Sequence, residues 1–184
     1  MPRQTREELL AEIRAVALQM FATKGYDATT LAEIAEQVGY SKGALLYHFG
    51  SKDQLLGEIL DPVSERIETL VDELTPLPRP QRWDRTLSAL VDLALRYRLE
   101  VACHGRLIDQ LPEHPAVARW TSTAGAVNAL LMDEEATVVD RIRVRFALVG
   151  LFHTPLRFPD VPENDLREVL SASLHAALVT ITPV

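Results

Sequence analysis

Three adjacent residues, Lys42, Gly43 and Ala44, combine one cation with two side chains of very small size. At the leading end of a helix, such a segment lets the backbone approach the edges of DNA bases. A lysine can donate to guanine acceptors, and an alanine methyl can contact a thymine methyl. Tyr47 and His48 follow at the other end of the segment, where a phenol and an imidazole can bond to phosphate. These residue types indicate contact with double-stranded DNA.

Two short helices and the turn between them must position these side chains. Thr30 and Glu33 have the spacing of a capping box, which predicts that the first helix begins there. Gly39 stands where a helix end favours a left-handed residue. Ser41 then begins a second helix that runs to about Phe49. Two short helices about a glycine turn are typical of a helix-turn-helix, whose second helix enters the major groove.

A third helix is predicted to begin at Ser51, with Gln54 as its capping-box partner. Thr30 and Lys52 thus both lie at the start of a helix. The unpaired N–H groups and the dipole of a helix N-terminus favour an anion, so both positions are candidate phosphate contacts.

Residues 10 to 56 resemble the DNA-binding domain of TetR-family transcriptional regulators. About a quarter of the chain is covered without a gap, and the residues in the family's order and spacing are Phe21, Lys24, Gly25, Tyr26, Asp27, Ala28, Thr29, Thr30, Ile34, Ala35, Gly39, Ser41, Lys42, Gly43, Leu45, His48, Phe49, Ser51 and Lys52. The resemblance implies an all-α homodimer that represses transcription until a small-molecule effector enters its C-terminal domain. The DNA contacts that we expect are Thr30, Tyr40, Ser41, Lys42, Gly43, Ala44, Tyr47, His48 and Lys52.

Two positions depart from the family pattern. Leu46 stands where the family usually has a tyrosine, so one phosphate contact is in doubt and Tyr47 is expected to replace part of it. Ala44 stands where the family often has threonine. An apolar contact there predicts an operator that differs at that base pair.

Composition restricts the class of protein. The chain has 184 residues and a net charge of −7, with 47% hydrophobic and 24% charged residues. No apolar run is long enough to span a bilayer, and the polar N-terminus is not a signal peptide. Cys103 is the single cysteine, which excludes an intramolecular disulfide framework and fits a reducing cytoplasm. The low charge predicts few phosphate contacts and a shallow salt dependence of DNA binding.

The remaining pattern is helical, with no strand signals. Two domains are expected: a DNA-binding domain over 1–50 and a ligand-binding and dimerisation domain over 51–184, with a proline-rich linker at 75–80. Pro62 predicts a kink or break in the helix that follows Ser51. Further prolines mark expected breaks at Pro112, Pro115, Pro155, Pro159 and Pro162. The expected helices outside the motif are 5–24, 82–102, 104–110, 115–132, 134–152 and 163–180.

The last two helices carry more apolar residues than one buried side needs. In the TetR family these two helices pair with their mates across a two-fold axis; completing a monomeric core is the alternative. A ligand pocket is mostly apolar with a few polar groups, and the candidate lining residues are Trp83, Leu87, Tyr97, Cys103, Leu107, Trp120, Asn128, Phe152 and His153. These residues favour an apolar or cationic small molecule as the ligand.

Other functions fit the sequence less well. His104, Asp109 and His114 cluster in sequence, but there is no G-x-S-x-G, H-E-x-x-H or phosphate-binding glycine loop. Neither catalysis nor a metal or cofactor is therefore expected. A helical protein-interaction module without DNA binding remains the alternative, although it would leave the Lys42–Ala44 pattern without a purpose.

Overall fold

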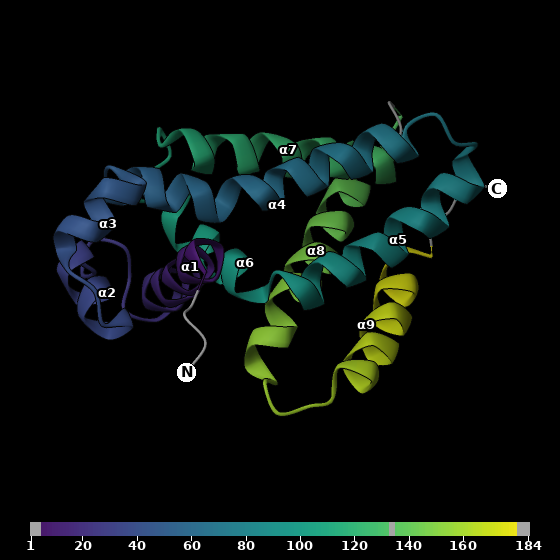
Figure 1. Ribbon diagram of the computed structural model, residues 1–184. Helices are drawn as coiled ribbons and strands as arrows, with labels where there is room; N and C mark the ends of the chain where they lie inside the picture. Colours follow the sequence, from purple (N-terminus) through teal and green to yellow (C-terminus); the bar gives the residue numbers. More distant parts are fainter. Residues whose placement is uncertain (1–4, 133–134, 180–184) are drawn as a thin grey trace.

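The computed structural model describes residues 5–132 and 135–179, and these residues form helices and no strand (Figure 1). The predicted all-α fold is confirmed. In chain order the helices are α1 (Arg6–Thr23), α2 (Leu31–Val38), α3 (Lys42–Phe49), α4 (Lys52–Leu74), α5 (Arg79–Arg96), α6 (Arg98–Leu107), α7 (Pro115–Leu131), α8 (Val138–Arg157) and α9 (Glu163–Leu178).

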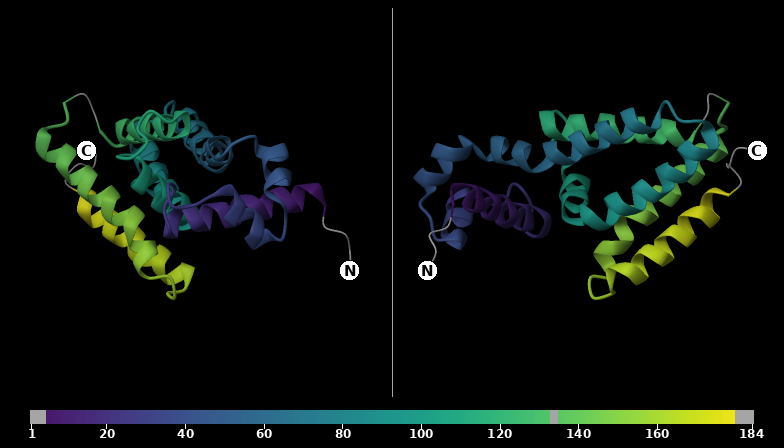
Figure 2. Two further views of the ribbon diagram at one scale, coloured as in Figure 1. Left: turned by 90° about the vertical axis from the view of Figure 1, so that its left-hand side faces the viewer. Right: turned by 45° about the vertical axis from the view of Figure 1, so that its right-hand side comes forward.

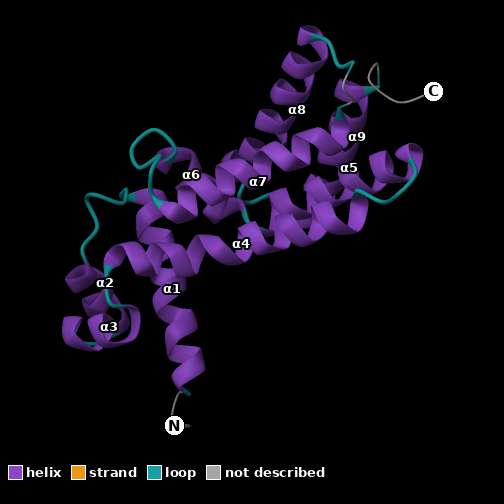
Figure 3. Ribbon diagram, turned by 90° about the horizontal axis from the view of Figure 1, so that it is seen from above, coloured by secondary structure: helices purple, strands orange, loops and turns teal. Residues whose placement is uncertain are grey.

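The first three helices form a head at one end of the molecule, and the others form a body (Figure 1). Helix α4 starts in the head and runs along the body beside α7, which is its most extensive packing partner. Helix α6 lies between the body and α1, which it contacts. Helices α8 and α9 pack side by side on the side of the body away from the head (Figures 2 and 3).

One apolar core connects the head to the body. In the head it includes the fully buried side chains of Ile13, Phe21, Ile34 and Leu45. Because α4 contributes buried leucines from its first turn onwards, the same helix packs in both parts. Helix α4 therefore links the packing of the body to that of the head.

Two prolines do not break their helices: a kink or break was expected at Pro62 and a break at Pro155. Helix α4 continues through Pro62, and α8 continues through Pro155 to Arg157. Pro62 is exposed, while Leu60 and Val63 beside it are buried. The packing of this apolar side holds the helix together where the proline removes one hydrogen bond.

Other helix limits also differ from those predicted. Helices 82–102 and 104–110 were expected, but the boundary between α5 and α6 falls at Tyr97. No glycine or proline marks this bend: Tyr97 has φ −110° and ψ 31°, which interrupts the helix at a single residue. Helix α5 already begins at Arg79, so the linker is only 75–78. The expected positions 134 and 180 lie outside the described residues.

Within the described ranges, none of the helices combines the length and the apolar character that a membrane crossing requires.

Candidate DNA-contacting face and ligand cavity

Short-range caps set the geometry of the two small helices. The backbone N–H of Glu33 donates to Thr30 Oγ1 (3.2 Å), and the N–H of Thr30 donates to Glu33 Oε2 (2.9 Å). Gly39 ends α2 with φ 75°, in the left-handed region. Ser41 Oγ accepts from the N–H of Ala44 (3.2 Å) and caps α3. The predicted turn, its glycine and both caps are confirmed, because each depends on contacts within four residues.

The cap of α4 is only half of the predicted box. Ser51 Oγ accepts from the N–H of Gln54 (3.0 Å), as expected. However, the N–H of Ser51 donates to the carbonyl of Phe49 (2.7 Å), so it is not available to the Gln54 side chain. The tight turn between α3 and α4 thus replaces the second half of the box.

The leading end of α3 is open to solvent. Lys42 and Gly43 are exposed, and Lys42 has no partner among the residues that the structure describes. Tyr47 is 82% exposed at the other end of the helix. Leu45 and Phe49 are buried and fasten the opposite side of α3 to the head. This arrangement presents one free cation beside a narrow backbone, which is the geometry that base contact requires.

His48 and Tyr47 form a polar edge on this helix. Their rings meet edge-on with centroids 5.1 Å apart. His48 Nδ1 is buried and has no hydrogen-bond partner in the described structure. Leu46, in the position where a tyrosine was the usual residue, is 39% exposed. A polar ring edge and an exposed leucine thus stand at the end of α3, and their contact with DNA stays a prediction.

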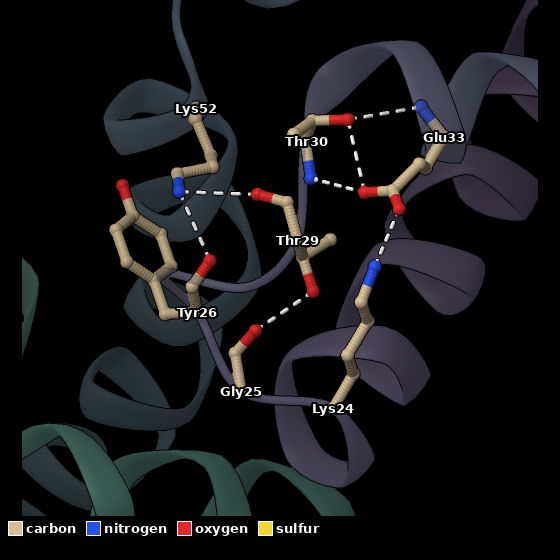
Figure 4. A network of polar contacts seen from close by, with 7 residues as sticks. All are labelled: Lys24, Gly25, Tyr26, Thr29, Thr30, Glu33 and Lys52. Atoms are coloured by element: carbon tan, nitrogen blue, oxygen red, sulfur yellow. Dashed lines mark hydrogen bonds and ion pairs between the residues drawn. The ribbon is translucent and has the colours of Figure 1, made fainter.

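Lys52 has a different role from the one that its place at a helix start suggested. Its Nζ donates to the carbonyls of Tyr26 (2.9 Å) and Thr29 (3.1 Å), and it lies 4.0 Å from the centroid of the Tyr26 ring (Figure 4). The Lys52 ammonium therefore ties the start of α4 to the turn between α1 and α2. A phosphate contact by this ammonium would compete with both bonds, whereas its backbone N–H at the helix start has no such conflict.

The same turn is fastened at further points. Thr29 Oγ1 donates to the carbonyl of Gly25 (2.7 Å), and Tyr26 Oη donates to Asp53 at the start of α4. Burial, followed by the bond to Asp53, raises the pKa of the Tyr26 phenol. Lys24 pairs with Glu33 and joins the end of α1 to α2 (Figure 4). Of the three lysines in the chain, only Lys42 is thus left without a bond inside the described structure.

Glu33 predicts an acid-sensitive head. The hydrogen bond from Lys24, followed by those from Thr30, lowers the pKa of Glu33 from 4.5 to about 2. Because the folded state prefers the ionised carboxylate, the stabilisation is complete above the unfolded pKa of 4.5 and is lost as the pH falls towards 2. We expect Glu33→Gln to lower the melting temperature at pH 7 and to flatten its decline between pH 4.5 and 2.5, as measured by circular dichroism.

The control for this experiment is Glu36→Gln, which removes a neighbouring exposed carboxylate without a partner among the described residues. It should leave the acid profile unchanged. Equal flattening by both variants would mean that net charge, and not the Glu33 cluster, controls the acid response.

A cavity of about 410 Å³ lies in the body and is lined by residues of α4, α5, α6, α7 and α8. Half of its lining residues are aliphatic, including Val63 and Ile67 of α4. Five predicted pocket residues line it: Tyr97, Trp120, Asn128, Phe152 and His153. Their contact with a ligand stays a prediction.

The other four pocket candidates lie in the core. Trp83, Leu87, Cys103 and Leu107 are buried but do not line the cavity, because their sides of α5 and α6 face neighbouring helices. Burial raises the pKa of the Cys103 thiol to about 12, so this cysteine stays protonated. Helical spacing identified buried positions but not the side of the helix that faces a void.

Sequence reasoning missed Arg145, which is one of the residues that line the cavity. A signal existed: Arg145, Leu148 and Phe152 follow at spacings of three and four residues, which puts them on one side of a helix. Since Phe152 was a candidate, its helical neighbours were candidates too. Within residues 5–132 and 135–179, no aspartate or glutamate lines the cavity, so this part of the structure gives no support to the predicted preference for a cationic ligand.

His104 and Trp120 form a flat pair in the wall. Their rings stack with centroids 4.7 Å apart and planes 15° from parallel. Thr121 Oγ1 donates to the carbonyl of Val117 (2.9 Å), so His104 Nε2 is the donor in its 3.3 Å bond to Thr121 Oγ1. Burial lowers the pKa of His104, which favours the neutral ring.

The head matches a known family model, described as bacterial regulatory proteins of the tetR family, over residues 13–59. A curated relative, the HTH-type transcriptional repressor Rv3405c of Mycobacterium tuberculosis, is 37% identical over 147 residues, which cover 80% of this chain and 72% of the relative. This match extends beyond the head and includes much of the body.

Solved structures share the fold. The ketosteroid transcriptional regulator KstR2 of Mycobacterium tuberculosis superposes with a TM-score of 0.75 at 20% identity, over 98% of each chain. A bacterial regulatory protein of the tetR family from Rhodococcus RHA1 has a TM-score of 0.67 at 21% identity, over 98% of this chain and 100% of that one. At these identities the likeness concerns the fold.

Proposed function

This chain belongs to the TetR family and is a DNA-binding transcriptional regulator, and we propose that it is a cytoplasmic, homodimeric repressor of an inverted-repeat operator that a small molecule releases. The observation that carries the proposal is the open leading end of α3, where Lys42 is free next to Gly43. The relative from Mycobacterium tuberculosis is called a repressor, which supports repression as the mode of action.

The recognition step divides between two kinds of contact. Lys42 and Ala44 at the start of α3 read base edges, whereas Tyr47 and His48 at its end contact phosphate. The start of α2 at Thr30 and the start of α4 at Lys52 add backbone N–H groups for phosphate. Few cations take part, so the salt dependence of binding is shallow.

A dimer places two such heads on one operator. The support is an exposed apolar surface on α8 and α9, which we call the α8–α9 face; its residues are Val138, Val139, Ile142, Phe146, Val149, Val169 and Val179. An isologous contact through this face relates the two recognition helices by a two-fold axis. Bound to successive major grooves, they lie roughly 34–36 Å apart.

The cavity is suited to act as the effector site because two helices that line it, α4 and α6, also bond to the head. Val63 and Ile67 of α4 line it, and the same helix carries Lys52, which holds the α1–α2 turn. From α6, His104 lines the cavity, while the neighbouring Arg106 Nη1 donates to the carbonyl of Thr23 at the end of α1 (3.4 Å). Ligand binding thus has two routes to the head.

How far the effector weakens DNA binding depends on the difference between its affinities for the DNA-bound and the DNA-free arrangement of the heads. An effector releases DNA only to the extent that it binds the DNA-free arrangement of the heads more tightly. We place the functional boundary at residue 50, between a DNA-binding unit over 1–50 and a ligand-binding and dimerisation unit over 51–184, with α4 as the coupling element.

Selection of bound sequences from a random duplex pool at low salt tests the proposal, and we expect an enriched inverted repeat. Lys42→Ala should then relax the preference at one base pair of each half-site and weaken binding to the selected site by about 1–3 kcal/mol. Fluorescence anisotropy with a set of single-base operator variants measures both effects.

Arg14→Ala is the matched control, because it removes the same charge from the head at an ion pair with Glu58 (2.9 Å). It should leave the base preference intact. Uniform weakening by Lys42→Ala on every sequence would assign Lys42 to phosphate instead of a base. A folded dimer that enriches no sequence would contradict the proposal and favour the protein-interaction alternative.

A further inference from the structure

The charges around the cavity all have one sign. Among the residues that the structure describes, none that lines the cavity is acidic, and Arg145 of α8 supplies a permanent positive charge. Arg145 is exposed to solvent and also lines the cavity. A charged group of a ligand in the cavity can therefore be reached by the Arg145 side chain, while apolar side chains make up much of the remaining wall.

Arg145 has no partner in the described structure, unlike two other arginines of the body. Arg119 is paired with Glu68 (2.7 Å) and Arg167 with Asp92 and Glu163. Among residues 5–132 and 135–179, no carboxylate neutralises Arg145. An unpaired guanidinium can take both oxygens of a planar anion in a bidentate contact.

Asn128 provides a second, independent observation. Its Oδ1 is buried without a hydrogen-bond partner in the described structure, and the residue lines the cavity. A buried polar group without a partner is costly, and a bound ligand can satisfy it. Asn128 lies about one turn before the end of α7, and Arg145 about two turns after the start of α8. Both thus lie towards the same, α7–α8 end of the cavity.

The part of the cavity wall that His104, Trp120 and Thr121 form carries no net charge. His104 donates to Thr121 and stacks on Trp120, and its lowered pKa keeps the ring neutral. The stacked pair and the aliphatic side chains of α4 and α5 offer a surface for a planar apolar group. A cation would meet the charge of Arg145 and, among the described lining residues, no compensating carboxylate.

We propose that the cavity takes an amphipathic anion, with a planar apolar body against Trp120 and a carboxylate held by Arg145 beside Asn128. This inference rests on the proposed role of the cavity as the effector site. It restricts the effector to apolar carboxylates of a volume that about 410 Å³ can hold. Apolar amines of the same size should bind more weakly because of the positive charge of Arg145.

Three probes with one ring system test the inference: naphthalene-2-carboxylate, naphthalene-2-carboxamide and naphthalen-2-ylmethylammonium. Isothermal titration calorimetry with the full chain measures each dissociation constant. We expect the carboxylate to bind at least tenfold more tightly than the ammonium, with the carboxamide between them. Arg145→Ala should weaken the carboxylate about tenfold and leave the carboxamide within about twofold, while Arg145→Lys should retain part of the carboxylate affinity.

Arg141→Ala is the matched control, since Arg141 lies one turn earlier on α8, is exposed and does not line the cavity. It should change none of the three affinities. Equal or tighter binding of the ammonium, an equal effect of Arg145→Ala on all probes, or binding of none of them would overturn the inference. Operator selection in the absence of probes is a separate readout, so a failure here is distinguishable from a failure to bind DNA.

Discussion

Replacing Phe146 with glutamate should give a folded monomer that has lost most of its operator affinity. Phe146 is 78% exposed on α8 and lies in the middle of the α8–α9 face. Burial of an aromatic side chain is worth about 1.5–3 kcal/mol, and a two-fold interface counts each residue twice. Glutamate also brings two carboxylates into an apolar contact, where each loses hydration.

These terms together predict a rise of at least about a thousandfold in the dimer dissociation constant. Light scattering coupled to size exclusion should show the change of mass, and circular dichroism should show that the helices remain. Operator affinity should fall at least about a hundredfold, because a monomer engages one half-site instead of two.

Ala118→Glu is the control for Phe146→Glu, because it adds the same charge at an exposed position of α7, outside the α8–α9 face. It should stay dimeric and bind the operator normally. A Phe146→Glu protein that remains dimeric at micromolar concentration would show that the chain dimerises through another surface. A monomer with intact operator affinity would separate DNA binding from dimerisation.

Lys52→Met should destabilise the head and weaken operator binding on all sequences alike. The change removes two charge-assisted hydrogen bonds and leaves the carbonyls of Tyr26 and Thr29 without this donor. Bonds of this kind contribute about 1.5–3 kcal/mol each, so a loss of about 3 kcal/mol is expected. For a chain of this length, the melting temperature should fall by about 6–12 °C.

The salt dependence of binding separates this role from direct phosphate contact. A lysine that neutralises one phosphate contributes about 0.9 to the slope of log affinity against log salt. Because the Lys52 ammonium is engaged within the head, we expect Lys52→Met to leave this slope unchanged. Lys42→Met serves as the control, and it should lower DNA affinity while it leaves the melting temperature within about 2 °C.

The opposite result for Lys52→Met would be informative too. An unchanged melting temperature with a slope reduced by about one would mean that Lys52 leaves the carbonyls of the α1–α2 turn and contacts a phosphate on DNA. The turn would then be held by the Tyr26–Asp53 and Lys24–Glu33 contacts alone.

The α8–α9 face shows which part of an exposed apolar surface the sequence pattern predicts and which part it does not. The surplus of apolar residues in the last two helices was evident in sequence, since a helix needs only one apolar side to pack on a core. The structure adds which of them remain uncovered, because the inner side of α8 is occupied by Val144, Ala147 and Leu151. Phe146 falls outside that stripe, and its exposure follows from the helical period.

The sequence by itself determined the helix-turn-helix. Thr30 with Glu33, the left-handed Gly39 and Ser41 with Ala44 act over at most four residues, so local spacing is sufficient to predict them. Only the tertiary structure decided the role of Lys52, whose partners lie 23 and 26 residues earlier in the chain. The same holds for the cavity, since five helices line it and no local pattern encodes which of their sides meet. Arg145 therefore emerged as a ligand-binding candidate, and Trp83, Leu87, Cys103 and Leu107 as core, only once the helices were packed.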